Sequence, residues 1–142
     1  MKKLICLLCI LFIVISTYLF AETKQVINSK NEFNGKTIML IFSSGDNSYK
    51  NGIAKTIAYY DSKEKLVKTE SFYTAESAKK DGVAKGIDYF DNKQKMVKAE
   101  SFFTDESAKK DGVAKGITYL DGNEKALKTD FYDRKGKLLS SK

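Results

Sequence analysis

The side chains of this sequence that could do chemistry are carboxylates, lysines and aromatic rings, because the chain contains no histidine. Without histidine, Ser–His and Cys–His catalysis and the commonest metal ligand are excluded. Both cysteines, Cys6 and Cys9, lie within the first 21 residues, so the rest of the chain has no thiolate nucleophile and no disulfide. Neither a Walker-type nor a Rossmann-type glycine motif occurs. Paired carboxylates remain the catalytic chemistry that the composition permits.

The carboxylates follow a period of 30 residues, which favours a structural role. An active site is needed once, whereas a structural contact is needed in every repeated unit. We therefore predict that the protein is not an enzyme and needs no cofactor or metal. The Asp46-Asn47 pair could suggest a calcium loop, but the further ligands of such a loop are missing, and we predict a turn. The recurring acids are Asp61, Asp91 and Asp121 in one set and Glu70, Glu100 and Asp130 in the other.

Aromatic residues recur in adjacent pairs and provide the candidate contact residues. Such side chains either form a platform for a sugar or a peptide, or pack the core of the repeat, which is the more frequent outcome. Adjacent residues of a strand point to opposite faces, so one member of each pair can stay exposed while the other packs. The candidate contact residues are Tyr59, Tyr60, Tyr73, Tyr89, Phe90 and Phe103.

The elements that must position these residues belong to tandem repeats of about 30 residues. The stretch Glu76–Ile87 occurs again without change at Glu106–Ile117. A fainter copy precedes the clear ones. The units are residues 21–50, 51–80, 81–110 and 111–140, and residues 22–142 form one β-hairpin repeat domain.

Each unit predicts a β-hairpin followed by a linker. Ile53–Tyr60 alternates in the manner of a strand, Asp61–Lys65 is a polar turn, and Leu66–Thr74 is rich in β-branched and aromatic residues. The linker Ala75–Asp81 is short for an isolated helix, so we expect a turn or one helical turn, with Gly82 as a turn glycine. Four such units predict an all-β fold, an antiparallel meander of about eight strands.

The lysines and the carboxylates predict a register for each hairpin. If Tyr59 lies opposite Leu66, then Lys55 lies opposite Glu70, and the pairing recurs in the following units. Opposite charges that face each other across two strands stabilise the pair by roughly 0.2–1 kcal/mol. We therefore expect a solvated ladder of lysine–carboxylate pairs that sets the register and is not a ligand site.

Residues 1–21 have the composition of a signal peptide. Lys2 and Lys3 precede an apolar run, Leu4–Phe20, and Ala21 is a small residue that suits signal peptidase. We predict cleavage after Ala21 and export to the periplasm, the cell surface or the medium. The alternative is an uncleaved membrane anchor, because the run reaches the lower limit of a membrane-spanning helix. Large residues precede both cysteines, which disfavours lipid attachment.

The mature chain is mildly basic. Removal of Lys2 and Lys3 leaves 23 basic and 18 acidic residues, a net charge of +5 with both signs interspersed. Arg134 is the only arginine, whereas nucleic-acid surfaces favour arginine and a patch of one sign. We therefore expect no nucleic-acid partner, and an interaction with a protein or with a polymer of the cell envelope.

The repeat resembles the bacterial MORN-variant repeat family, in which a glycine is followed by an aromatic pair and then by Asp-x-x-Gly-Lys-Leu. Glu64, Gln94 and Glu124 stand in the place of the turn glycine, so we expect these turns to avoid positive φ or to move it to another residue. Residues 132–138 are the closest copy of the turn and predict a further hairpin at the end of the chain. The matching residues of the clearest unit are Gly52, Tyr59, Tyr60, Asp61, Lys65 and Leu66.

The resemblance implies an antiparallel β-repeat sheet with a binding or scaffolding role, and it supplies no catalytic residues. We interpret the chain as an exported non-catalytic protein that mediates protein or cell-envelope interactions. Some members of the family are labelled antitoxins of toxin–antitoxin systems, so an antitoxin-like inhibitor module is one alternative. A basic cell-surface adhesin that holds an anionic polymer is another.

Overall fold

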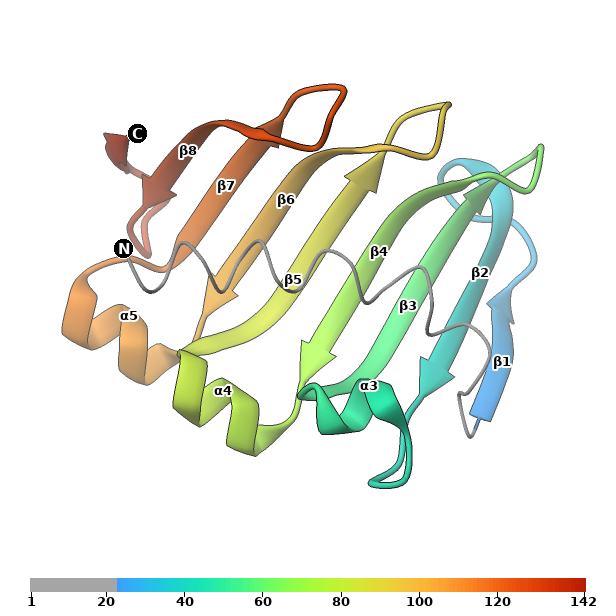
Figure 1. Cartoon of the computed structure of the whole chain (residues 1–142), viewed down its shortest axis with the longest axis horizontal. Helices are drawn as coiled ribbons and strands as arrows, with labels where there is room; N and C mark the ends of the chain where they lie inside the picture. Colours follow the sequence, from blue (N-terminus) through green and yellow to red (C-terminus); the bar gives the residue numbers. More distant parts are fainter. Residues whose placement is uncertain (1–22) are drawn as a thin grey trace.

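The computed structural model describes residues 23–142, which form one antiparallel sheet of nine strands. The strands pair in the order in which they occur in the sequence, so the chain runs as a meander from β1 to β9 (Figure 1). The predicted all-β meander of hairpin repeats is confirmed. The predicted signal peptide, residues 1–21, lies outside the described residues. Within the described part of the chain, no helix has the length and apolar character needed to span a membrane.

Two strands and one short helix repeat along the chain. The four units supply eight strands, and the ninth, β9, follows a turn at residues 133–137, which confirms the further hairpin predicted at the end of the chain. The strands are β1 Thr23–Asn28, β2 Asn34–Ile41, β3 Ile53–Asp61, β4 Leu66–Tyr73, β5 Val83–Phe90, β6 Met96–Phe103, β7 Lys115–Leu120, β8 Ala126–Tyr132 and β9 Leu138–Ser141. The helices are α3 Asn47–Lys50, α4 Ala75–Asp81 and α5 Asp105–Asp111.

The linkers α4 and α5 form helices of seven residues, longer than the single turn expected from their sequence. In α4 the Thr74 hydroxyl accepts a hydrogen bond from the Ser77 N–H at 3.2 Å, and Gly82 ends the helix in the left-handed conformation, with φ 71°. Lys79 and Lys80 lie in the last turn, where the helix dipole favours cations. The same caps recur in α5. These caps stabilise helices that would otherwise be marginal.

The tight turns of the hairpins are held by the recurring aspartates. After β3, the Asp61 side chain accepts hydrogen bonds from the backbone N–H groups of Lys63 and Lys65, at 2.8 and 2.9 Å. Side chains of this kind stabilise a turn by replacing a backbone acceptor. The same pair of bonds recurs at Asp91, Asp121 and Asp133.

The expectation that these turns avoid or move positive φ is wrong. Glu64, Gln94 and Glu124 have φ values of 60°, 64° and 61°. The turn itself requires this conformation, since Gly136 adopts it in the equivalent turn, with φ 77°. The side chains of the other three residues reach the preceding hairpin. Gln94 bonds to both the N–H and the carbonyl of Leu66, and Glu124 accepts from the Met96 N–H at 3.2 Å. Glycine would relieve the backbone but would remove these bonds between successive hairpins.

Replacing Gln94 with glycine is expected to destabilise the protein by about 1 kcal/mol. Glycine relieves the strain of the left-handed backbone, which gains about 1 kcal/mol. The change also removes two hydrogen bonds to Leu66, which costs about 1 kcal/mol for each bond. Glu64→Gly is the matched control, because Glu64 instead makes an exposed ion pair with Lys36, which contributes little. We expect Glu64→Gly to be neutral or stabilising in urea unfolding. An equal response of the two variants would contradict this account.

The predicted register of the hairpin is wrong by one residue at the turn and by two residues beyond a β-bulge. Tyr60 lies opposite Leu66 in the place predicted for Tyr59, because a β-bulge shifts the register between the two tyrosines. Lys55 consequently faces Phe72 and not the predicted carboxylate. The same shift recurs in the β5–β6 and β7–β8 hairpins. The ladder of lysine–carboxylate pairs expected directly across each hairpin is therefore absent from these three hairpins.

The core lies on one face of the sheet and combines small residues with large side chains from the strand ends. The ring of Tyr73 lies over Gly86, since a Cβ added there would be 3.1 Å from the Tyr73 hydroxyl. Leu66, Phe90 and Met96 pack together near the tight turns. The small residues form one row of direct cross-strand partners, Thr56, Ser71, Gly86, Ser101 and Gly116.

Candidate functional site

The face of the sheet opposite the core, which we call the outer face, carries three rows of direct cross-strand partners from β3 to β8. The lysine–aromatic row consists of Lys55, Phe72, Lys85, Phe102, Lys115 and Tyr132. The isoleucine–acid row consists of Ile57, Glu70, Ile87, Glu100, Ile117 and Asp130. The tyrosine–lysine row consists of Tyr59, Lys68, Tyr89, Lys98, Tyr119 and Lys128.

The rows follow from the repeat and from the reversal of the chain at each turn. Every second residue of a strand points to the outer face, which selects lysine, isoleucine and tyrosine along β3. Along β4, read in the opposite direction, the same positions carry an aromatic residue, an acid and a lysine. Because successive strands are antiparallel and the units repeat, each row alternates its residue types from β3 to β8.

In the lysine–aromatic row the ammonium groups lie over the rings of neighbouring strands. The Lys55 Nζ lies 4.3 Å from the centre of the Phe72 ring. The Lys85 Nζ lies between two rings, 5.7 Å from the centre of Phe72 and 5.0 Å from that of Phe102. The Lys115 Nζ lies 5.9 Å from the centre of Phe102. Because cations at these distances are attracted to ring faces, the rings hold the lysine side chains along the row.

The positive charges of the lysines in the tyrosine–lysine row are compensated by carboxylates of the isoleucine–acid row. The Lys98 Nζ lies 2.9 Å from the carboxylate of Glu100, and the Lys128 Nζ lies 2.9 Å from that of Asp130. Lys68 makes the equivalent contact at 3.3 Å. Each pair joins residues two apart on one strand, whose side chains share a face. Positive charge in this row is therefore largely neutralised.

Burial and these contacts set the ionisation of the face. Burial alone would raise the pKa of the Glu70 carboxyl, but the 3.1 Å hydrogen bond from the Tyr59 hydroxyl and the Lys85 ammonium outweigh burial and lower this pKa. Burial also works against a charged Lys98, but the Glu100 carboxylate outweighs it and raises the pKa of Lys98. Glu70 is therefore ionised and Lys98 protonated at neutral pH. These contacts provide fixed charge and not groups poised for proton transfer.

Among the three rows of the outer face, the lysine–aromatic row is the one whose lysines include members without a carboxylate partner. Among residues 23–142, Lys55 and Lys115 contact aromatic rings, and neither forms an ion pair within 4.0 Å. Lys85 approaches the Glu70 carboxylate at 3.3 Å, but Glu70 is shared with Lys68. Of the three rows of the outer face, this row would therefore attract an anionic ligand most strongly.

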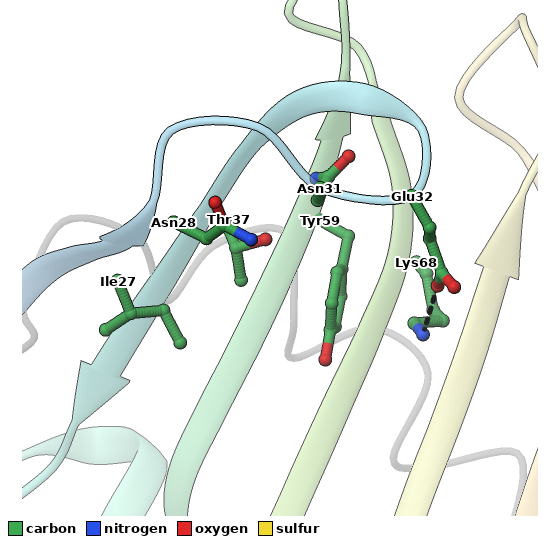
Figure 2. A pocket seen from close by; sticks show the side chains of 7 residues that line it. All are labelled: Ile27, Asn28, Asn31, Glu32, Thr37, Tyr59 and Lys68. Carbon is green, nitrogen blue, oxygen red and sulfur yellow. Dashed lines mark hydrogen bonds and ion pairs between the residues drawn. The ribbon is translucent and has the colours of Figure 1, made fainter.

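A hollow of about 480 Å³ lies where the loop between β1 and β2 leans over the tyrosine–lysine row (Figure 2). The Phe33 ring meets the Tyr59 ring edge to face, with 6.4 Å between the ring centres. The Lys68 Nζ lies 2.9 Å from the Glu32 carboxylate, so its charge is compensated from two sides. The hollow is lined by Ile27, Asn28, Asn31, Glu32, Thr37, Tyr59 and Lys68.

The structure divides the six candidate contact residues between the two faces. Tyr59 and Tyr89 lie on the outer face, opposite Lys68 and Lys98. Whether any of the six contacts a partner stays a prediction. The other four pack on the core side, Phe90 within a buried cluster, Tyr60 and Tyr73 against buried clusters, and Phe103 over Gly116.

Sequence reasoning missed Phe72 and Phe102, which are the outer members of the second aromatic pair of each unit. It also missed the grouping of Lys55, Lys85 and Lys115 with these rings. The signal was present, because lysine, aromatic and acidic residues alternate along each strand. The β-bulge decided which residues share a row, and the sequence does not display a bulge.

Comparison with known proteins adds no assignment. No family model matches the sequence, and no curated protein or solved structure matches it. The part of the chain that the structure describes also has no group of three or more acidic residues suited to a metal ion. A function for the chain is therefore inferred from the outer face itself.

Proposed function

We propose that the chain is an exported, non-catalytic repeat protein that binds a protein or a polymer of the cell envelope on its outer face. One observation supports the proposal above the others: ordered rows of charged and aromatic side chains continue across six strands, from β3 to β8. Catalysis needs its groups once, whereas a repeated face can engage a large partner along its length. The MORN-like resemblance and the composition of residues 1–21 agree with an exported binding role.

The arrangement of the sheet and the helices supports access of a partner to the outer face. The strands form a single sheet, and α3, α4 and α5 lie along one end of the strands (Figure 1). Within residues 23–142, the β1–β2 loop leans over the outer face at one end of the tyrosine–lysine row (Figure 2). The side chains of the lysine–aromatic row are half-buried, which lowers the entropy lost when a partner binds.

The uncompensated lysines support one narrower function, that of a basic cell-surface adhesin. Lys55 and Lys115 lie over rings and lack a carboxylate partner among the described residues. Such a row would attract an anionic envelope polymer more strongly than a neutral protein surface. The antitoxin-like alternative has the family label as its support.

Sedimentation with isolated cell envelopes tests the proposal. We expect the chain from Glu22 onward to sediment with envelopes. The double variant Lys85→Glu with Lys115→Glu is expected to weaken the affinity for envelopes by about tenfold or more, because like charges then face an anionic partner. Lys63→Glu with Lys93→Glu is the matched control, since it changes the net charge equally at exposed turn positions.

The comparison of the two double variants decides the outcome. Retention by the control and loss by the outer-face variant support binding on this face. Equal loss in both variants, or no loss in either, would show that the outer face is not the binding surface. Export is tested on protein recovered outside the cytoplasm. Its intact mass is expected to equal that of a chain whose first residue is Glu22.

A further inference from the structure

We infer that the lysine–aromatic row is a binding site for an extended anionic polymer, which crosses the strands and places its carboxylate or phosphate groups on Lys55, Lys85 and Lys115. The inference rests on the proposed function, because it names the ligand class of the same face. It commits to a polymer of the cell envelope and not to an acidic protein or a nucleic acid.

The spacing of the lysines sets the shape of the ligand. Lys55, Lys85 and Lys115 stand on β3, β5 and β7 and belong to one row of direct partners. Alternate strands are about 10 Å apart, so the three ammonium groups extend over about 20 Å. A small anion can reach one of them, whereas a chain that lies across the strands reaches all three. Each added contact is then intramolecular, which strengthens binding by effective concentration.

The rings favour an anion and disfavour stacking. Phe72 lies between Lys55 and Lys85, and Phe102 lies between Lys85 and Lys115, so ammonium groups stand over the ring faces. Single-stranded nucleic acids are usually held by bases stacked on aromatic faces, and these faces are occupied. The row therefore presents a regular series of cations, which matches a regular series of anionic groups.

The other lysines of the face explain why this row is selected. Lys98 and Lys128 each lie 2.9 Å from a carboxylate of the same strand, so an anion must compete with a bound acid there. Lys55 and Lys115 have no such competitor among the described residues. Because the rings hold the ammonium groups in place, little side-chain freedom is lost on binding.

Titration of the chain from Glu22 with purified polymers tests the inference. Polygalacturonate supplies carboxylates, linear polyphosphate supplies phosphates, and dextran is the neutral polymer. We expect binding to at least one of the two polyanions and none to dextran, and the preferred polyanion identifies the source of the anionic group. Monomeric galacturonate and inorganic phosphate are expected to bind at least about tenfold more weakly than the matching polymer.

Two triple variants separate the row from net charge. Lys55→Gln with Lys85→Gln and Lys115→Gln is expected to weaken polymer binding by about tenfold or more and to reduce the slope of log affinity against log salt by about 2. The matched control removes three exposed lysines outside the row. Its polymer affinity and its salt slope should stay close to those of the unmodified protein. Its changes are Lys63→Gln, Lys80→Gln and Lys93→Gln. Urea unfolding of each variant confirms that it is folded.

Several results would overturn the inference. Equal weakening by both triple variants would mean general attraction by net charge. Tighter binding of a single-stranded oligothymidylate than of either polyanion would indicate a nucleic-acid surface. Absence of polyanion binding would also overturn it. If envelope sedimentation still depends on Lys85 and Lys115 in that case, the proposed function stands and the partner is a protein; if sedimentation is independent of them, both proposals fail.

Discussion

Replacing Gly35 with alanine is expected to destabilise the protein by about 3 kcal/mol. A Cβ at this position would lie 2.2 Å from the carbonyl oxygens of both Tyr60 and Asp61. These are backbone atoms at the end of β3, so they cannot move aside as a side chain can. Gly35 lies where the pairing of β2 with β3 shifts between Asn34 and Thr37. Thermal and urea unfolding measure the loss.

Gly122→Ala is the control for this prediction. Gly122 has no heavy atom within 4 Å of the added Cβ and is not in the left-handed region, so the change is expected to stay within about 0.5 kcal/mol. Gly35→Ala should also disturb the loop over the outer face, because Asn31 donates a hydrogen bond to the Tyr60 carbonyl at 3.0 Å. If both alanine variants unfold at the same urea concentration, the close approach of β2 to the end of β3 is wrong.

Removing the charge of Asp88 is expected to stabilise the protein at neutral pH by about 1–2 kcal/mol. Asp88 lies on the core side between Thr69 and Ala99, and burial raises its pKa to about 6. The Thr69 hydroxyl, at 3.5 Å, opposes this only weakly. A rise of about two pKa units corresponds to about 3 kcal/mol, and the lower figure is expected because Asp88 keeps part of its surface in solvent.

The pH dependence has a defined sign. The pKa of Asp88 is raised on folding, so between about pH 4 and pH 6 the folded chain binds more of this proton than the unfolded chain does. The contribution of Asp88 to stability is therefore most favourable below about pH 4 and declines as the pH rises to about 6. Above that range its unfavourable contribution is constant. The free energy of unfolding in urea, measured from pH 4 to pH 8, follows this change.

Two variants separate the charge of Asp88 from its shape. Asp88→Asn keeps the volume, and Asp88→Thr introduces the residue found at the equivalent position Thr118. Both are expected to flatten the decline in stability between about pH 4 and pH 6, because both remove the ionisable group. A decline that persists in both variants would assign the pH dependence to another acid.

The repeat makes the outer face from few residues. Each unit contributes the same lysine, aromatic and acidic positions, and antiparallel pairing aligns them with those of the next unit. The bonds between successive turns keep this alignment, as Lys65 donates to the Asn92 carbonyl at 2.8 Å. A face that grows by whole units suits a polymeric ligand better than a small one, because added length gives added contacts.

The sequence by itself determined the features that depend on neighbours along the chain. Alternation with a period of two predicted a strand over Ile53–Tyr60, and β3 spans Ile53–Asp61. The second strand, predicted over Leu66–Thr74, is β4 at Leu66–Tyr73. The turn at Asp61–Lys65 was also predicted, from its polar residues, and Asp61 binds backbone N–H groups of its own turn, which is a local interaction. The repeat then carried these elements over the other units.

The tertiary structure alone decided the register and the composition of the rows. The register decides which side chains face each other across two strands, and the balance between registers depends on partners in other strands. The bulge before Tyr60 thus placed Lys55 against Phe72. The hydrogen bonds of the Gln94 side chain likewise reach Leu66, 28 residues away. The lysine–aromatic row arises from contacts between separate units, and no local pattern in the sequence specifies such contacts.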